Sequence, residues 1–364
     1  MGSVNLDNTG SGSAITLSSD GTSLLLDGTA IGGGGAALEL YAENPSTPTT
    51  PVATGANAVA IGSGTTASGS DSVGIGQGVT SYGAQSLALG ASAYVLGQYA
   101  TGVGRGVQAL SASSTAIGRG SSVSAHATSG SGAMALGGSY ASGTDSLAAA
   151  IANNTSSYGA TGANSVAIGK RAKATDGTST AIGQDAVASN GGFAFGVSSV
   201  ASASGSVALG GPSVADKVGK LSFTGRSLSG TGQTQAGMIV LMSDTTDATP
   251  EALTSNNSTA STTNQVILPN NSAYAFHGTI VARQQAPGTA CAAWKIEGLI
   301  RRENGVGTTV LVNSATTVLD NTPAWGMALT ADTTNGGLKI EVTGAAATNI
   351  RWVATINTSE VTYA

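Results

Sequence analysis

The chain has 364 residues, of which 54 are Gly, 40% are apolar and only 9% are charged, and its net charge is −5. This composition excludes a disordered polyelectrolyte, which would carry more charge, and a collagen, which would need Gly at every third position and more than 8 Pro. The mild acidity provides no basic stripe for nucleic acid, and without a run of about 18 apolar residues no membrane helix is predicted. We therefore expect an all-β chain whose turns are supplied by Gly, Ser, Asn and Asp.

Residues 1–44 are expected to form a small N-terminal β-segment. The first seven residues contain neither a positive region nor an apolar core, so no signal peptide is predicted. Asp20-Gly21 and Asp27-Gly28 lie between short apolar runs, which favours tight β-turns. Residues 45–55 are then predicted to be a linker, because their three prolines at intervals of three stiffen an extended chain.

A short motif repeats along residues 56–211. At residues 165–169 it reads Ser-Val-Ala-Ile-Gly, with apolar residues at i and i+2, a small residue between them and a glycine after them. A strand of about five residues is too short to form a core alone, so the repeat predicts stacked coils of a parallel β-solenoid. The last residue of the motif recurs eleven times, with five copies spaced by 14: Gly62, Gly76, Gly90, Gly104, Gly118, Gly137, Ala150, Gly169, Gly183, Gly196 and Gly210.

The alternation within each strand predicts two faces. We expect the paired aliphatic residues to point into the coil, where they would form continuous inner ladders, and the small residue between them to point out. On this interpretation Ile168→Asp would bury an unpaired carboxylate and collapse the rod. The pairs that define the expected ladders are Val59 with Ile61, Val73 with Ile75, and Leu87 with Leu89.

These 14-residue repeats closely resemble the head of YadA-like trimeric autotransporter adhesins. Calcium-binding nonapeptide rolls would need an Asp in every repeat, and hexapeptide helices have turns of about 18 residues, so neither alternative fits. The resemblance implies a left-handed parallel β-roll over residues 56–211, with three chains packed side by side in a homotrimer. Two spacings of 19 predict lateral loops at 125–128 and 153–156, which are either side contacts or tolerated insertions.

The flanks point away from a bacterial autotransporter, which would need a secretion signal, a coiled-coil stalk and a membrane barrel. The segment 1–44 instead resembles the opening of tail-fibre proteins of tailed bacteriophages, and residues 349–356 resemble the closing stretch of their distal domains. Residues 212–221 are predicted to be a second linker. This resemblance implies a virion protein whose N-terminal segment attaches to the particle.

Residues 222–364 are predicted to form an antiparallel β-sandwich. Nine of the 14 basic residues lie beyond residue 215, and period-two stretches occur at 273–283, 292–301, 308–312, 337–342 and 350–356. All three tryptophans, Trp294, Trp325 and Trp352, fall here, either as core residues or as contacts for a receptor. We expect this domain to be the receptor-binding end of the fibre, and the sequence assigns no individual receptor-binding residue.

Few residues suggest catalysis. A glycosidase would need two carboxylates held about 5–10 Å apart, and the pairs considered are Asp176 with Asp185, Asp244 with Asp247, and Glu297 with Glu341. We interpret all three pairs as solvated charges. His126 and His277 are interpreted as packed or surface residues rather than general bases, and Cys291 as a small buried hydrophobe.

The remaining basic cluster, Lys170-Arg171-Ala172-Lys173, is interpreted as an exposed solubilising turn, with an anionic surface polymer as the alternative partner. We therefore predict no catalytic residue, no metal site and no cofactor. The prediction is a non-enzymatic, homotrimeric fibre or spike of a tailed bacteriophage that contacts a host-surface glycan or protein. The alternatives are a bacterial adhesin fragment, a capsid-decorating fibre and a polysaccharide-degrading tailspike.

Overall fold

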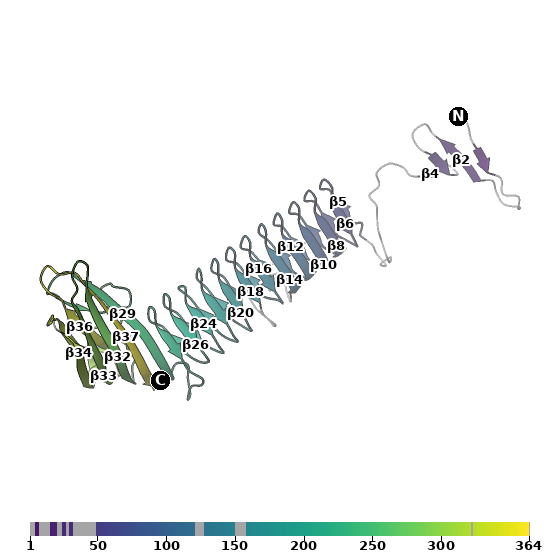
Figure 1. Ribbon diagram of the computed structural model, residues 1–364. Coiled ribbons are helices and arrows are strands. Elements are labelled where there is room, and N and C mark those ends of the chain that lie inside the picture. The colour runs from purple at the N-terminus through teal and green to yellow at the C-terminus, as the bar shows by residue number, and fades with distance from the viewer. Residues whose placement is uncertain are drawn as a thin grey trace.

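The computed structural model describes residues 49–120, 127–149, 158–321 and 323–363, together with four short strands nearer the N-terminus. A long rod of stacked coils leads into a C-terminal β-domain (Figure 1). Among the described residues the single helical element is a 3₁₀ turn, η1 (Val306–Thr308). None of these residues belongs to a helix long and apolar enough to cross a membrane.

The N-terminal strands form an antiparallel sheet in the order β1-β2-β3-β4. The turns expected at Asp20-Gly21 and Asp27-Gly28 lie outside the described residues, as do 45–48 of the expected linker. The strands are β1 (Val4–Leu6), β2 (Ile15–Ser19), β3 (Leu24–Leu26) and β4 (Thr29–Ile31).

The rod consists of two parallel ladders of short strands, twelve in each. One ladder is a separate sheet of two-residue strands: β5 (Val52–Ala53), β7 (Thr66–Ala67), β9 (Thr80–Ser81), β11 (Tyr94–Val95), β13 (Gln108–Ala109), β15 (Ala127–Thr128), β17 (Tyr140–Ala141), β19 (Gly159–Ala160), β21 (Lys173–Ala174), β23 (Val187–Ala188), β25 (Val200–Ala201) and β27 (Val214–Ala215). The other carries the repeated motif: β6 (Val59–Ile61), β8 (Val73–Gln77), β10 (Leu87–Ala91), β12 (Thr101–Arg105), β14 (Thr115–Arg119), β16 (Met134–Leu136), β18 (Leu147–Ala149), β20 (Val166–Ile168), β22 (Thr180–Ile182), β24 (Phe193–Phe195), β26 (Val207–Leu209) and β28 (Leu221–Phe223).

Each coil contributes one strand to each ladder, and equivalent residues of successive copies lie directly opposite one another. Ala88, for example, pairs with Gly74 on one side and Gly102 on the other. The predicted parallel solenoid is therefore confirmed. With strands about 4.8 Å apart, the twelve coils make a rod roughly 50 Å long.

The rod continues further than predicted. β27 and the first residue of β28, Leu221, lie in the segment 212–221 that we expected to be a linker, and the two strands pair in parallel with β25 and β26. This last coil was missed because Ser222 replaces the usual small apolar residue and Thr224 replaces the usual glycine.

The orientation of the strands is opposite to the one predicted. The small residue between the two aliphatics is the one inside: Ala88, Ala116 and Ala181 are 0% exposed. The aliphatic residues point outward, and Val59 is 42%, Ile75 38% and Ile168 37% exposed. The roll is so thin that columns of alanine from its two sheets fill most of the interior, and the valines buried there, Val79, Val95 and Val107, come from outside the motif strands.

The corners of the coils explain the rest of the motif. Where a serine precedes the aliphatic pair, as in most copies, it is buried, and the hydroxyl of Ser165 donates to the carbonyl of Gly162, three residues back, at 2.6 Å. The closing glycine has a positive φ, and the close approach of the next coil excludes a side chain. At Gly104, for instance, φ is 132° and a Cβ atom would lie 1.7 Å from the carbonyl oxygen of Gly118.

The C-terminal domain continues the motif-bearing ladder. β28 pairs with β29, and the order then runs β29-β37-β32-β33-β34, all antiparallel. A smaller antiparallel sheet has β36 paired with β35 on one edge and with β30 and β31 on the other. The strands are β29 (Thr234–Thr245), β30 (Pro250–Ala252), β31 (Val266–Ile267), β32 (Ser272–Gln284), β33 (Cys291–Arg302), β34 (Val310–Asp320), β35 (Gly326–Asp332), β36 (Gly337–Thr343) and β37 (Ile350–Thr362).

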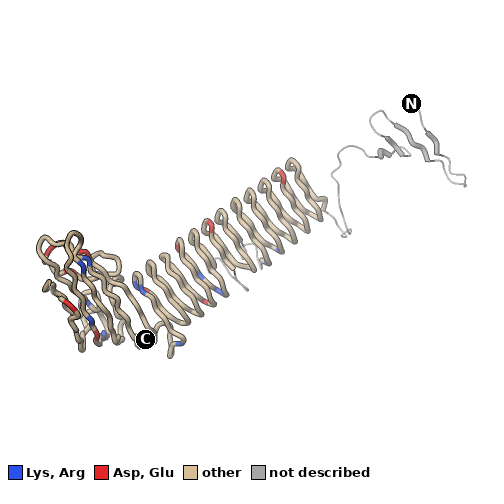
Figure 2. Tube along the Cα trace, in the orientation of Figure 1, with Lys and Arg blue, Asp and Glu red and all other residues tan. Residues whose placement is uncertain are grey.

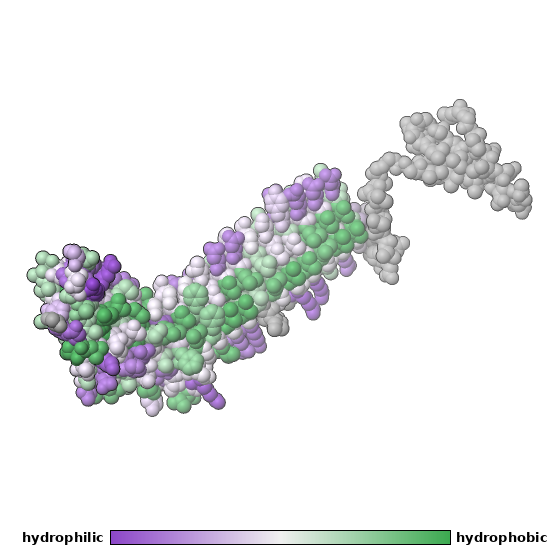
Figure 3. Space-filling model, viewed as in Figure 1, coloured by the Kyte–Doolittle hydropathy of each residue, from purple (hydrophilic) through white to green (hydrophobic). Residues whose placement is uncertain are grey.

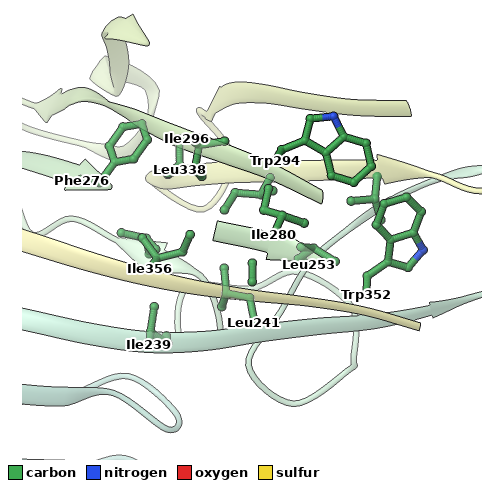
Figure 4. Packing of buried hydrophobic residues seen from close by; sticks show 14 of the residues in the cluster. Ile239, Leu241, Leu253, Phe276, Ile280, Trp294, Ile296, Leu338, Trp352 and Ile356 are labelled. Carbon is green, nitrogen blue, oxygen red and sulfur yellow. The ribbon is translucent and has the colours of Figure 1, made fainter. Parts of the chain in front are cut away.

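One apolar core fills the space between these two antiparallel sheets (Figure 4). The antiparallel strands expected after residue 222 are thus present. All three tryptophans belong to this core: the rings of Trp294 and Trp352 stack at 5.9 Å, and Trp325 lies 5.7 Å from Trp352. The alternative of tryptophans exposed to a receptor is therefore excluded.

Candidate functional site

The most extended surface feature is an apolar face along the rod. We call it the aliphatic ridge and define it by the outward residues of the motif strands β6 to β28. No aliphatic motif residue of the described coils is buried, and Phe193 (39%) and Phe223 (57%) are as open as the aliphatic residues. Figure 3 shows the ridge as an apolar band that follows the rod toward the C-terminal domain. Contiguous apolar surface of this extent is typical of a protein–protein contact.

A second feature is a hollow of about 380 Å³ on the outer face of the five-stranded sheet. Two rows of outward side chains cross the strands there. In one row Asn357, His277 and Glu297 lie directly opposite one another on β37, β32 and β33. In the other row Thr355, Thr279 and Lys295 lie opposite one another on the same three strands. The hollow is a band of polar and oppositely charged groups that extends to Ala315 and Thr317 of β34.

Two residues of this hollow were considered in the sequence: His277 as a possible general base, and Glu297 as one member of a possible pair of catalytic carboxylates. His277 was predicted to be a packed or surface residue, and it is exposed on β32. Lys295, Asn357 and Thr355 were not singled out, because the order in which distant strands pair is not visible in their alternation. The polar outward positions of three strands form a site only once β37 is known to lie between β29 and β32.

A third feature is a buried polar cluster where the last coil meets the domain. Nζ of Lys220 donates to Oε2 of Glu360 at 2.8 Å, with side-chain exposures of 8% and 1%. Nε2 of Gln235 donates to the same oxygen at 2.8 Å, and the hydroxyl of Thr358 donates to Oε1 at 2.6 Å. Burial, assisted by the charge of Glu360, raises the pKa of the neighbouring Tyr274. Both oxygens of the Glu360 carboxylate accept hydrogen bonds from protein groups. We therefore assign this cluster a structural role, which is to join the rod to the C-terminal domain.

The carboxylates of the acidic pairs considered for hydrolysis interact with other groups of the protein. Asp176 precedes β22 and accepts a hydrogen bond from the backbone N–H of Asn190 at 3.0 Å, whereas Asp185 follows β22. Asp244 pairs with Arg351 at 3.2 Å. The hydrogen bond from the backbone N–H of Thr249 lowers the pKa of Asp247.

Glu297 and Glu341 lie on different sheets, on β33 and β36, and Glu341 forms an ion pair with Lys339. In each of the three pairs, at least one carboxylate forms an ion pair with a basic residue.

Charges along the rod are sparse (Figure 2). The cluster 170–173 contains one well-defined contact: Nη2 of Arg171 donates to Oδ2 of Asp185, one coil further along, at 2.7 Å. That contact lowers the pKa of Asp185 to about 2. His126 and the loop 153–156 lie outside the described residues.

Cys291 departs from its prediction. It begins β33 with an exposed thiol, because the outward positions of this strand include residue 291. The prediction of a small buried hydrophobe was therefore wrong.

Within the described ranges, no three His, Cys, Asp or Glu side chains gather closely enough to hold a metal ion.

The family of the repeat is identified by sequence. Residues 53–78, 160–186 and 189–211 match the family model of the YadA head domain repeat, and all three ranges lie in the rod. The rod is therefore a parallel solenoid that carries YadA head repeats, as its resemblance to this family predicted. No curated protein matches the chain in sequence.

Three solved tailspike structures are similar to parts of the chain. The tailspike from Acinetobacter baumannii bacteriophage Fri1, a capsular polysaccharide depolymerase, is 8% identical with a TM-score of 0.22, and the match covers 81% of this chain and 63% of the tailspike. The Acinetobacter baumannii phage AM24 tailspike is 9% identical with a TM-score of 0.24, over 87% of this chain and 68% of that protein. The Acinetobacter phage vB_ApiP_P1 tailspike is 12% identical with a TM-score of 0.18, over 80% of this chain and 51% of that protein.

These neighbours correct one prediction. The chain was expected to have no enzymatic activity, and a structure similar to it is a capsular polysaccharide depolymerase, which contradicts that expectation. At TM-scores of 0.18 to 0.24 the likeness assigns no activity to this chain. The expectation of a non-enzyme is therefore not retained, and activity on polysaccharide is a matter for direct assay.

Proposed function

We propose that the chain is a homotrimeric fibre or spike of a tailed bacteriophage and that it attaches the virion to the surface of a host cell. The observation that carries this proposal is the aliphatic ridge. An aliphatic residue on nearly every coil faces solvent in a single chain, and at about 25 cal/mol per Å² the burial of this surface favours lateral association. The number three comes from the YadA head repeats, whose family implies side-by-side trimers.

The proposed roles of the segments follow their order along the chain. Residues 1–44 are proposed to attach the fibre to other virion proteins through the linker that follows, and the roll is proposed to act as a spacer. The C-terminal domain is proposed to contact a host glycan or protein, with avidity supplied by three copies. The boundary between spacer and binding domain is placed near residue 224, where the last coil ends.

The trimer is tested by the solution mass of the full chain at micromolar concentration, where a mass near three chains is expected and a monomer contradicts the proposal. Ile168→Asp sharpens this test. Because Ile168 is exposed in the single chain, we now expect this variant to fold and to dissociate at lower denaturant concentration than the wild type. The matched control is Gln108→Asp, which places the same charge on the other ladder, in β13.

Host attachment is tested with purified capsular polysaccharide, the substrate class named for one of the similar tailspikes. Retention of intact polysaccharide by the trimer supports attachment. Shortened polysaccharide chains would identify a depolymerase. A trimer that binds neither polysaccharide nor whole host cells, and does not shorten polysaccharide, contradicts the proposed attachment.

A further inference from the structure

We propose that the outer face of the five-stranded sheet is a subunit interface, by which the C-terminal domains of three copies pack against one another. We call this surface the sheet face; its exposed apolar residues include Met238, Val240, Met242, Val281 and Val353. The inference rests on the proposed trimeric rod and extends it. In this arrangement, association does not stop at the last coil but continues through the domain that was expected to be free for the receptor.

The first argument is continuity with the aliphatic ridge. β28 pairs with β29 so that Leu221 lies opposite Met238 and Phe223 opposite Ala236. Directly paired residues of two strands project to the same side of a sheet, so the ridge and the sheet face are one side of one sheet. A neighbour that covers the ridge to its end thus meets β29 next.

The second argument is the composition of the sheet face. Met242, Val353 and Val281 are consecutive partners across β29, β37 and β32, and they are 36%, 41% and 51% exposed. The inner faces of the same strands carry the apolar core of the domain, so the sheet is apolar on both sides along β29 and this row, whereas the neighbouring part of the outer face carries the polar hollow. Outward positions that faced water along β29 and this row would be expected to be polar, as they are in the hollow.

The third argument is the edge strand β34. It has 11 residues, and side chains on both of its faces are exposed, including Val312 at 48%, Val318 at 56% and Leu319 at 52%. A long edge strand that exposes apolar side chains at both of its ends invites association unless it is covered. The uncovered edge and the uncovered sheet face adjoin, because β34 pairs with β33 of the same sheet.

These observations favour another copy of this chain as the occupant. The ridge repeats with the coil spacing of about 4.8 Å, and a second roll aligned alongside has the same spacing and then presents the same sheet face at the same height. The hollow fits this arrangement as well. Lys295 and Glu297 lie two residues apart on β33, so copies that meet there bring both signs of charge to the contact. Receptor contacts would then fall to the smaller sheet and the loops.

The test compares two thiols in the assembled full chain, each in a Cys291→Ser background. One is Val281→Cys, on the sheet face, and the other is Thr330→Cys, exposed on β35 of the smaller sheet. Both positions are open in a single chain, so neither change disturbs the core. We expect maleimide to label the thiol at 281 about ten-fold more slowly than the thiol at 330, because access requires the interface to open.

Solution mass is measured on the same samples and separates the two proposals. A trimer in which both thiols react at the same rate overturns the sheet-face interface and leaves the trimeric rod intact. A monomeric mass contradicts both the trimeric rod and the sheet-face interface. As a second readout, Val281→Glu is expected to lower the melting temperature of the trimer while Thr330→Glu leaves it unchanged, and equal melting temperatures would count against the interface.

Discussion

The roll and the C-terminal domain are both all-β, but they bury opposite kinds of side chain. Inside the roll are columns of alanine and serine with a few valines, and the aliphatic residues of its motif strands face out. Inside the domain are tryptophan, isoleucine and leucine from two sheets, and alanine has a minor part. The two regions share one continuous sheet, so the backbone pairing is not what differs between them.

The comparison teaches how each region obtains its stability. The domain encloses large apolar side chains and has a core of its own. A coil of the roll encloses little apolar surface, and its stability depends on hydrogen bonds to the coils above and below and on whatever covers the ridge. Substitutions inside the two regions should therefore act through different mechanisms.

The largest effect is expected from Trp352→Ala in the domain core. Trp352 is 0% exposed, packs against the two other tryptophans and donates from Nε1 to the hydroxyl of Thr245 at 2.9 Å. Its removal should cost about 3–5 kcal/mol of the free energy of unfolding of the domain. Tryptophan fluorescence measures this transition selectively, because all three tryptophans lie in the domain.

The control for that variant is Arg351→Ala, the preceding residue of β37. Its side chain is 70% exposed and makes one surface ion pair with Asp244, so the expected loss is about 0–1 kcal/mol. If the two variants unfolded at the same denaturant concentration, the core assigned to the domain would be incorrect.

A smaller effect is expected from Ala181→Leu inside the roll. Ala181 is 0% exposed and lies between Ala167 and Ala194 of the neighbouring coils, so leucine overpacks a column made of alanine. We expect a loss of about 1–3 kcal/mol, measured by far-ultraviolet circular dichroism during denaturation. The matched control is Thr180→Leu, whose neighbours in the adjacent coils are Val166 and Phe193. Equal losses in the two variants would contradict the alanine interior.

The smallest effect is a pH dependence of the roll. Arg171 lowers the pKa of Asp185 to about 2, below its value in an unfolded chain. The contact therefore stabilises the roll above about pH 4, and its contribution is lost as the pH falls toward 2. Asp185→Asn should melt slightly lower than the wild type at pH 6 and at the same temperature at pH 2. A difference between the two melting temperatures that persisted at pH 2 would show that another property of Asp185 is responsible.

Much of the fold could be predicted from the repeat, and the reason for the error about its faces is physical. A spacing of i and i+2 shows that Val166 and Ile168 share a face, but it does not show which face is inside. The useful clue was the residue between them: in nearly every copy it is Ala or Gly, and a position that tolerates only small residues is the confined one. Ser222 and Thr224 departed from the pattern, which concealed the twelfth coil.

The candidate surfaces were harder to predict than the fold. The strands β32, β33 and β37 were recognisable from their alternation, whereas β29 was not singled out, although its twelve residues join the roll to the domain. The sheet face and the hollow depend on the order of pairing, which brings Met242 beside Val353 and His277 beside Glu297. Such neighbours lie far apart in the chain or on separate strands, and no local pattern relates them.

The uninterrupted sheet also has a mechanical consequence. Strands in the roll lie across the rod, so their hydrogen bonds run along it, and a pull on the C-terminal domain loads the bonds between successive coils in series. At the junction the load crosses the β28–β29 pairing and the buried contact between Lys220 and Glu360 rather than a bare linker. The rod and the domain should therefore bend and transmit force as one strut, which keeps the domain at a fixed angle under load.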